Sequence, residues 1–111
     1  MPRRQRALIA RGDVWDADVP DVGSHPVVVI TRDSAIPVLT SLVCALITSS
    51  FHGHVAEVEV GRAEGLDHDC AVSCDNLVTL PRSVLVRRRG RLGPQQLDRL
   101  DRALVIALGI D

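Results

Sequence analysis

Aromatic residues, lysine and long apolar runs are scarce or missing from this sequence. Aromatic side chains make up 2% of the 111 residues, so Trp15 and Phe51 are the only aromatic platforms on which nucleic-acid bases could stack. All 13 basic residues are arginine, a bias that codon usage explains at least as well as phosphate binding does. No apolar stretch reaches the roughly 18 residues that cross a membrane. Association with a membrane is therefore not expected.

Cysteine content and the N-terminus indicate a reducing compartment. Three cysteines, an odd number, argue against a disulfide framework. Cys70 and Cys74 are four residues apart and lack the CxxC spacing of a zinc site, while Cys44 lies inside an apolar run as a small core residue. Residues 7–10 are too short an apolar segment for a signal peptide. We predict a cytoplasmic protein with neither a metal nor another cofactor.

Length and composition predict one small domain dominated by β-structure. A chain of 111 residues suits a single core, which must consist mainly of valine, leucine, isoleucine and alanine. We expect residues 1–10 to form a mobile N-terminal arm and residues 11–111 to form the domain. The net charge is only −1, although arginines crowd the stretch 82–91.

Periodicity predicts five or six strands followed by one helix. Residues 12–19 alternate apolar and polar side chains, as a half-buried strand does. Strands are also expected over 27–30, 42–47, 55–60 and 70–74, the last leading into 75–80, with a turn or short helix from Pro81. Pro94 suits the first turn of a helix that Gly109 ends, and leucines recur at helical spacing between them. The fold class is α+β: a small α+β domain or a capped β-barrel.

Two apolar strands carry polar residues at fixed ends. His25 precedes the run 27–30, and Thr48 follows the run 42–47. Buried strands hold their end residues rigidly, as a catalytic site requires. His25 could equally be an ordinary loop histidine, and Thr48 a strand-end cap whose hydroxyl bonds the backbone.

The order of these pieces resembles the MazF/PemK family of toxin endoribonucleases. The matching landmarks are residues 11–15, the Gly-Ser-x-Pro-Val-Val-Val-Ile stretch 23–30, Ile-Thr-Ser at 47–49, residues 69–76 and the closing segment 103–109. The resemblance implies an SH3-like (PemK-type) barrel with a long C-terminal helix through which two copies form a homodimer. It also implies cleavage of single-stranded RNA without a metal, by attack of the ribose 2′-hydroxyl on the adjacent phosphate, and restraint by an antitoxin protein.

The resemblance assigns roles residue by residue. Thr48 matches the family threonine directly, and Asp75 matches an acidic position used for acid–base work or substrate contact. Where the family has an arginine, just before the proline of the second strand, this chain has His25. Histidine can exchange a proton near neutral pH, but it does not supply the permanent bidentate charge of arginine. Asp75 could instead be a simple turn residue beside Asn76.

Further RNA-contacting candidates are polar or basic residues near these positions or in other loops and the arginine-rich stretch: Ser24, Ser49, His52, His54, Arg32, Arg82 and Arg87. The two loop histidines and the arginine stretch could also be solvated surface. The expected function is a sequence-selective, metal-independent endoribonuclease toxin. The alternative is a catalytically impaired homologue that only binds RNA or its antitoxin, and a plain nucleic-acid-binding barrel is a third reading. Apolar residues on more than one side of the terminal helix favour a symmetric dimer.

Overall fold

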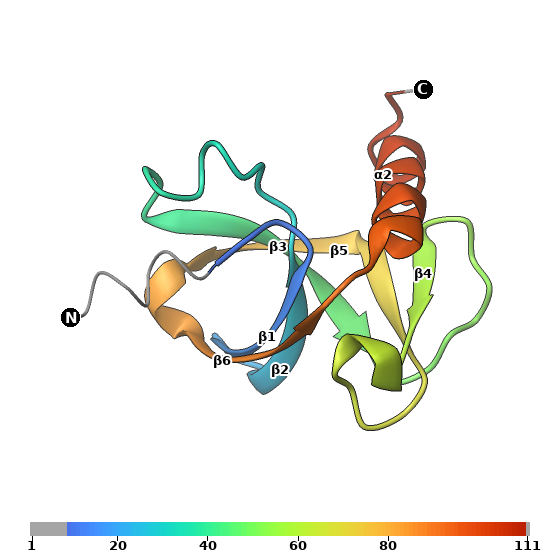
Figure 1. Ribbon diagram of the computed structural model, residues 1–111, viewed down its shortest axis with the longest axis horizontal. Coiled ribbons are helices and arrows are strands. Elements are labelled where there is room, and N and C mark those ends of the chain that lie inside the picture. Colours follow the sequence, from blue (N-terminus) through green and yellow to red (C-terminus); the bar gives the residue numbers. More distant parts are fainter. Residues whose placement is uncertain (1–8, 111) are drawn as a thin grey trace.

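The computed structural model describes residues 9–110, which form a curled antiparallel sheet and one C-terminal helix (Figure 1). The sheet has six strands in the order β4-β5-β3-β2-β1-β6. The elements are β1 (Asp13–Val19), β2 (Gly23–Val29), β3 (Ser41–Thr48), β4 (Glu57–Val60), the short 3-10 turns η1 (Arg62–Glu64) and η2 (Arg82–Val84), β5 (Cys70–Pro81), β6 (Leu85–Arg91) and α2 (Pro94–Leu108). The predicted β-dominated α+β class is confirmed.

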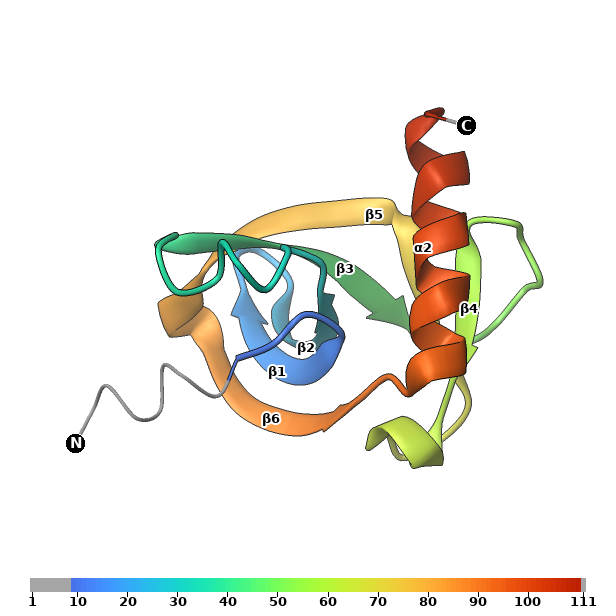
Figure 2. The ribbon, with the colours of Figure 1, turned by 45° about the horizontal axis from the view of Figure 1, so that its top comes forward.

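Side chains on both faces of the central strands are buried, as their unbroken apolar sequences predict. Val27, Val28 and Val29 are fully buried in β2, and Cys44 and Ala45 are fully buried in β3. Alternate residues of these strands enter two separate apolar clusters, one on each face of the sheet. The sheet curls around one cluster, whereas α2 stands over β4 and β5 and covers the other (Figure 2). This burial on both faces holds the strand ends in place.

The ends of α2 lie where the sequence places them. Pro94 opens the helix, and Gly109 ends it in a left-handed conformation with φ 67°, which glycine adopts without steric cost. Leu100 and Leu104 are buried against the sheet, whereas Leu108 is exposed. The helix is therefore partly a core element and partly an open apolar surface.

Strand β6 is the element that the sequence analysis missed. Its residues, mostly arginine, pair with β1 at the edge of the sheet. Charged residues suit an edge strand, since they discourage pairing with another chain. Arg89 holds this edge through Asp16 at 3.0 Å, Asp67 at 3.2 Å and the Gly65 carbonyl at 3.1 Å.

Two further expectations differ in extent. The strand expected over 55–60 begins at Glu57, because residues before it form a turn in which the Glu57 amide donates to His54. The segments 70–74 and 75–80 form one continuous strand, β5, with an irregular step in its pairing to β3. Residues 1–8 of the predicted arm lie outside the described residues. Ala10, the last residue of the predicted arm, donates its amide to the carboxylate of buried Asp13.

Candidate functional site

His25 and Thr48 lie opposite each other where β2 meets β3. Val27 pairs with Leu46, and Val28 pairs with Ala45. Continuing this antiparallel register by two residues places His25 opposite Thr48. The two residues that the sequence analysis singled out at separate strand ends therefore belong to one place in the fold.

A missing backbone donor brings the His25 side chain into this position. The Ile30 amide donates to Val43 at 2.8 Å, and the alternation of an antiparallel ladder makes Pro26 and Ile47 the equivalent hydrogen-bonded pair. Proline has no N–H, so the Ile47 carbonyl lacks its ladder partner. Nε2 of His25 lies 2.8 Å from that carbonyl oxygen and replaces the missing bond.

This contact fixes which nitrogen of His25 is free. A carbonyl oxygen can only accept a hydrogen bond, so Nε2 carries a proton and donates it to Ile47. In the neutral ring Nδ1 is then the acceptor. His25 is half-buried, and its ring is held in one orientation with a nitrogen available to take up a proton.

The Thr48 hydroxyl faces backbone acceptors in the same region. Its Oγ1 lies 3.1 Å from the Ser50 carbonyl and 3.4 Å from the Ala71 carbonyl on β5. A hydroxyl carries one proton, so it donates to one of these oxygens at a time. A phosphate oxygen would compete for this proton, and a charged acceptor forms the stronger bond.

Asp75 belongs to an irregular segment of β5 beside Ala45 and Leu46 of β3. Ser73 pairs with Leu46 and Leu77 pairs with Ala45, so residues 74–76 interrupt the ladder. Asp75 is exposed, and its neighbour Asn76 donates to the Ser73 hydroxyl at 2.8 Å. A bulge of this kind re-aims side chains beside a site. It places Asp75 opposite Ala45 and Leu46, two to three residues before Thr48 on β3.

The loop after Thr48 is ordered by Glu57, a residue that the sequence analysis did not select. One carboxylate oxygen of Glu57 accepts the amides of His52 at 2.9 Å and His54 at 3.3 Å. Burial by itself would raise the pKa of Glu57, but these two hydrogen bonds and the nearby imidazoles lower it below its ordinary value. The only hint in the sequence was its position just after the two histidines.

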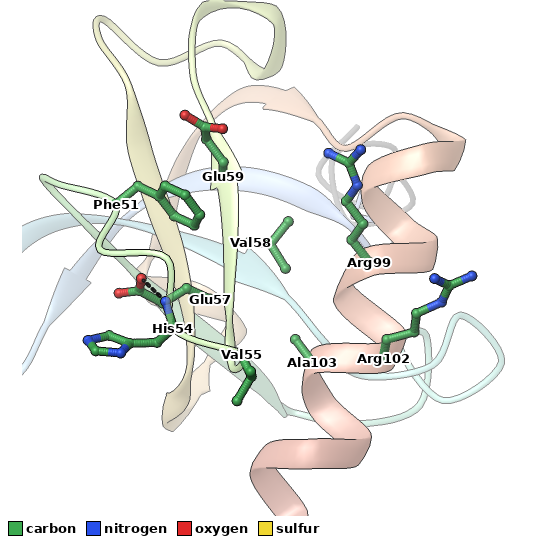
Figure 3. A pocket seen from close by; sticks show the side chains of 9 residues that line it. All are labelled: Phe51, His54, Val55, Glu57, Val58, Glu59, Arg99, Arg102 and Ala103. Carbon is green, nitrogen blue, oxygen red and sulfur yellow. Dashed lines mark hydrogen bonds between the residues drawn. The ribbon is translucent and has the colours of Figure 1, made fainter.

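A groove of about 350 Å³ lies between this loop, β4 and α2 (Figure 3). Glu57 and Glu59 belong to its β4 side, and Arg99 and Arg102 project from α2 opposite them. Phe51 adds an exposed aromatic ring. The arginines of α2 were missed because their spacing is that of an ordinary solvated helix face.

The predicted arginines divide between the two ends of the sheet. The Arg87 side chain is 71% exposed, and its Nε lies 3.9 Å from a carboxylate oxygen of Asp16. In the sheet, Asp16 on β1 lies opposite Pro26 on β2, next to His25. Arg32 and Arg82 lie at the other end, where Ser41 begins β3 opposite Pro81. Ser41 and Thr48 are seven residues apart along β3, at about 3.3 Å per residue. Arg32 and Arg82 therefore lie at the end of β3 opposite to Thr48. Arg82 donates there to the Leu39 carbonyl at 3.1 Å.

Ser24 and Ser49 are exposed and lie next to His25 and Thr48 in the sequence. Among residues 9–110 no group of three or more histidine, cysteine, aspartate or glutamate side chains is arranged to hold a metal ion. No helix in that range is long and apolar enough to cross a membrane.

Comparison with known families identifies the fold. A family described as the PemK-like, MazF-like toxin of type II toxin-antitoxin systems matches residues 10–108. The chain belongs to the PemK/MazF toxin family. "Probable endoribonuclease MazF5" of Mycobacterium tuberculosis is 36% identical over 104 residues, covering 92% of this chain and 94% of the relative. "Probable endoribonuclease MazF2" of the same species is 39% identical over 88 residues, covering 78% and 85%.

Solved structures of PemK/MazF toxins share the architecture. The Mycobacterium tuberculosis toxin MazF-mt6 superposes with a TM-score of 0.83 at 33% identity, covering 89% of this chain and 98% of that one. A mycobacterial endoribonuclease solved with its cognate antitoxin has a TM-score of 0.84 at 23% identity, covering 93% and 97%, which is a likeness of fold. The expected PemK-type barrel with a C-terminal helix is therefore confirmed.

Proposed function

We propose that this PemK/MazF chain is a sequence-selective, metal-independent endoribonuclease that cleaves single-stranded RNA. The observation that carries the proposal is the contact of His25 with the carbonyl of Ile47, the residue directly before Thr48, at the end of β3. His25 and Thr48 are both oriented by backbone carbonyls in a chain of a toxin family. Relatives named as endoribonucleases at 36–39% identity support the same activity.

The proposed reaction is an intramolecular displacement at phosphorus. Nδ1 of His25 takes the proton of the ribose 2′-hydroxyl, whose oxygen forms a bond to the adjacent phosphorus. The bond from phosphorus to the 5′-oxygen breaks, and that oxygen takes a proton from water to leave as a hydroxyl. The products are a 2′,3′-cyclic phosphate and a 5′-hydroxyl end. Thr48 donates its hydroxyl to a non-bridging phosphate oxygen, where negative charge builds in the transition state.

Neighbouring polar groups would hold the RNA strand. Ser24, Ser49, His52 and His54 surround the pair with exposed donors, while Asp75 would contact the substrate from the β5 bulge. Arg87 would supply phosphate affinity at the same end of the sheet. Arg32 and Arg82, at the other end of β3, would meet only RNA that extends across the whole sheet.

A second candidate function is a homologue that binds RNA or antitoxin without cleaving. Two observations favour it. Histidine replaces the family arginine and therefore lacks a permanent bidentate charge for the phosphate. In addition, the His25 ring already replaces the hydrogen bond that Pro26 cannot make, which is a structural role sufficient to explain the residue.

We further propose the assembly and setting that the family implies. Ile106, Leu108 and Ile110 are 45%, 55% and 70% exposed on and after α2. Such a patch is unusual on a monomer of this size and fits two equivalent copies joined across the helix. An antitoxin protein would restrain the dimer in the cytoplasm, and residues 11–111 would act as one domain behind an N-terminal arm.

Cleavage of a long RNA in EDTA tests the proposal. Mapping the 5′ ends of the products should give cuts at one short sequence, each with a 5′-hydroxyl. A Thr48→Ala protein purified in parallel controls for contaminating nuclease. Intact RNA together with measurable binding would support the second candidate and overturn the first.

A further inference from the structure

The Thr48 hydroxyl is connected to Glu57 by a chain of hydrogen bonds. Thr48 donates to the Ser50 carbonyl at 3.1 Å, and the Ser50 hydroxyl lies 3.2 Å from Nε2 of His52. The His52 amide then donates to Glu57 at 2.9 Å, and the His54 amide donates to the same carboxylate oxygen. Figure 3 shows the last of these bonds as a dashed line between Glu57 and His54.

This chain is the main support of an otherwise exposed loop. Residues 49–55 are all exposed. Within the described part of the chain, the hydrogen bonds of residues 49–54 stay inside the segment 48–57. A segment with so few buried contacts opens locally at small cost unless something restrains it. Glu57 belongs to β4, which pairs with β5, so its carboxylate ties the loop to the sheet.

We infer that Glu57 is a positioning residue of the ribonuclease site. It fixes the loop whose Ser50 carbonyl accepts the Thr48 hydroxyl, and so holds the Thr48 side chain in one rotamer until a phosphate oxygen takes over that hydrogen bond. The inference rests on the proposed function. Glu57 acts only through the loop. Its negative charge suits this task, because a carboxylate accepts two amides more strongly than a neutral group does. The lowered pKa of Glu57 keeps the carboxylate charged at neutral pH.

The strand offers a matched control. Glu59 has the same charge, lies two residues further along β4 and is exposed. Among the described interactions its side chain accepts no loop amide, although its backbone carbonyl accepts Gln96. Replacing Glu59 changes the charge of this edge equally without touching the loop. A general electrostatic effect on RNA binding would therefore appear in both variants.

Steady-state cleavage of one short oligonucleotide tests the inference. Glu57→Ala should lower kcat at least fivefold and raise KM by a smaller factor, because the same loop carries His52 and His54, which are proposed to hold RNA. Glu57→Gln should be intermediate, because its carbonyl still accepts amides. Glu59→Ala should remain within twofold of wild type. In a Thr48→Ala background, Glu57→Ala should have little further effect, since the group that it orients is gone. Equal losses in Glu57→Ala and Glu59→Ala, or full additivity with Thr48→Ala, would overturn the inference.

Amide hydrogen exchange separates this inference from the proposed function. The His52 and His54 amides should exchange at least tenfold faster in Glu57→Ala than in Glu59→Ala, whether or not RNA is cleaved. Unchanged exchange refutes the positioning role by itself. A wild-type protein that leaves RNA intact refutes the proposed function, and with it the catalytic consequence, even when the exchange result holds.

Discussion

Replacing His25 with glutamine should separate its structural role from its chemical role. Glutamine places an amide nitrogen the same number of bonds from the backbone as Nε2 of histidine. It can therefore donate to the Ile47 carbonyl, which His25 now reaches at 2.8 Å. Glutamine has no nitrogen that takes up a proton near neutral pH. The substitution keeps the hydrogen bond and removes the proposed base.

The magnitudes follow from the half-buried position of the ring. His25→Ala leaves the Ile47 carbonyl without either its ladder partner or its side-chain donor, and a lost hydrogen bond of this kind costs about 1 kcal/mol when water can enter. For a domain of 111 residues that is roughly a 4 °C fall in melting temperature. His25→Gln should stay within about 0.5 kcal/mol of wild type. Cleavage should fall by about 10²-fold or more in both variants, the usual loss when a general base is removed.

Thermal unfolding at fixed protein concentration and single-turnover cleavage of one oligonucleotide measure the two effects. A glutamine variant that cleaves within twofold of wild type would refute the proton-transfer role and leave His25 as a structural cap. An increase in rate for His25→Arg would instead show that this position serves phosphate charge.

Four other outcomes are expected. Thr48→Ala should lose at least tenfold in cleavage but only about 1 kcal/mol in stability, and a fully active, folded variant would remove Thr48 from the site. Gly90→Ala should destabilise the domain by about 1–3 kcal/mol, because the added Cβ would lie 2.4 Å from the carbonyl oxygen of Glu64 in η1. Gly93→Ala is the control, because a Cβ added there meets no atom within 4 Å. Equal melting temperatures of the two variants would contradict the packing argument. Burial raises the pKa of Cys44 to about 12 and, with a smaller contribution from a neighbouring aspartate, that of Cys74 to about 11, so both thiols should resist iodoacetamide at pH 8 until the protein is denatured; rapid labelling of the native protein would contradict this. Light scattering at micromolar concentration should give twice the 12.0 kDa of one chain, and a monomer mass would refute the dimer.

The sequence alone was sufficient for the elements whose signals are local. Runs of valine and isoleucine predicted the buried strands, and Pro94 and Gly109 predicted both ends of the helix, since each acts through its own backbone geometry. The residues at the strand ends could also be selected as candidates. Strand β6 could not be predicted, because an arginine-rich segment becomes a strand only through its pairing with β1.

The arrangement of the candidate site depends on contacts between distant segments. The register of β2 on β3 places His25 opposite Thr48, and the absent amide of Pro26 turns the ring toward Ile47. Glu57 was missed for a different, local reason: its importance lies in the amides of His52 and His54, which a turn that the sequence does not signal directs at its carboxylate. Local propensity acts over a few residues, whereas register is decided by which faces the whole sheet buries. The sequence therefore determined which residues could take part, and the tertiary structure alone decided which of them meet.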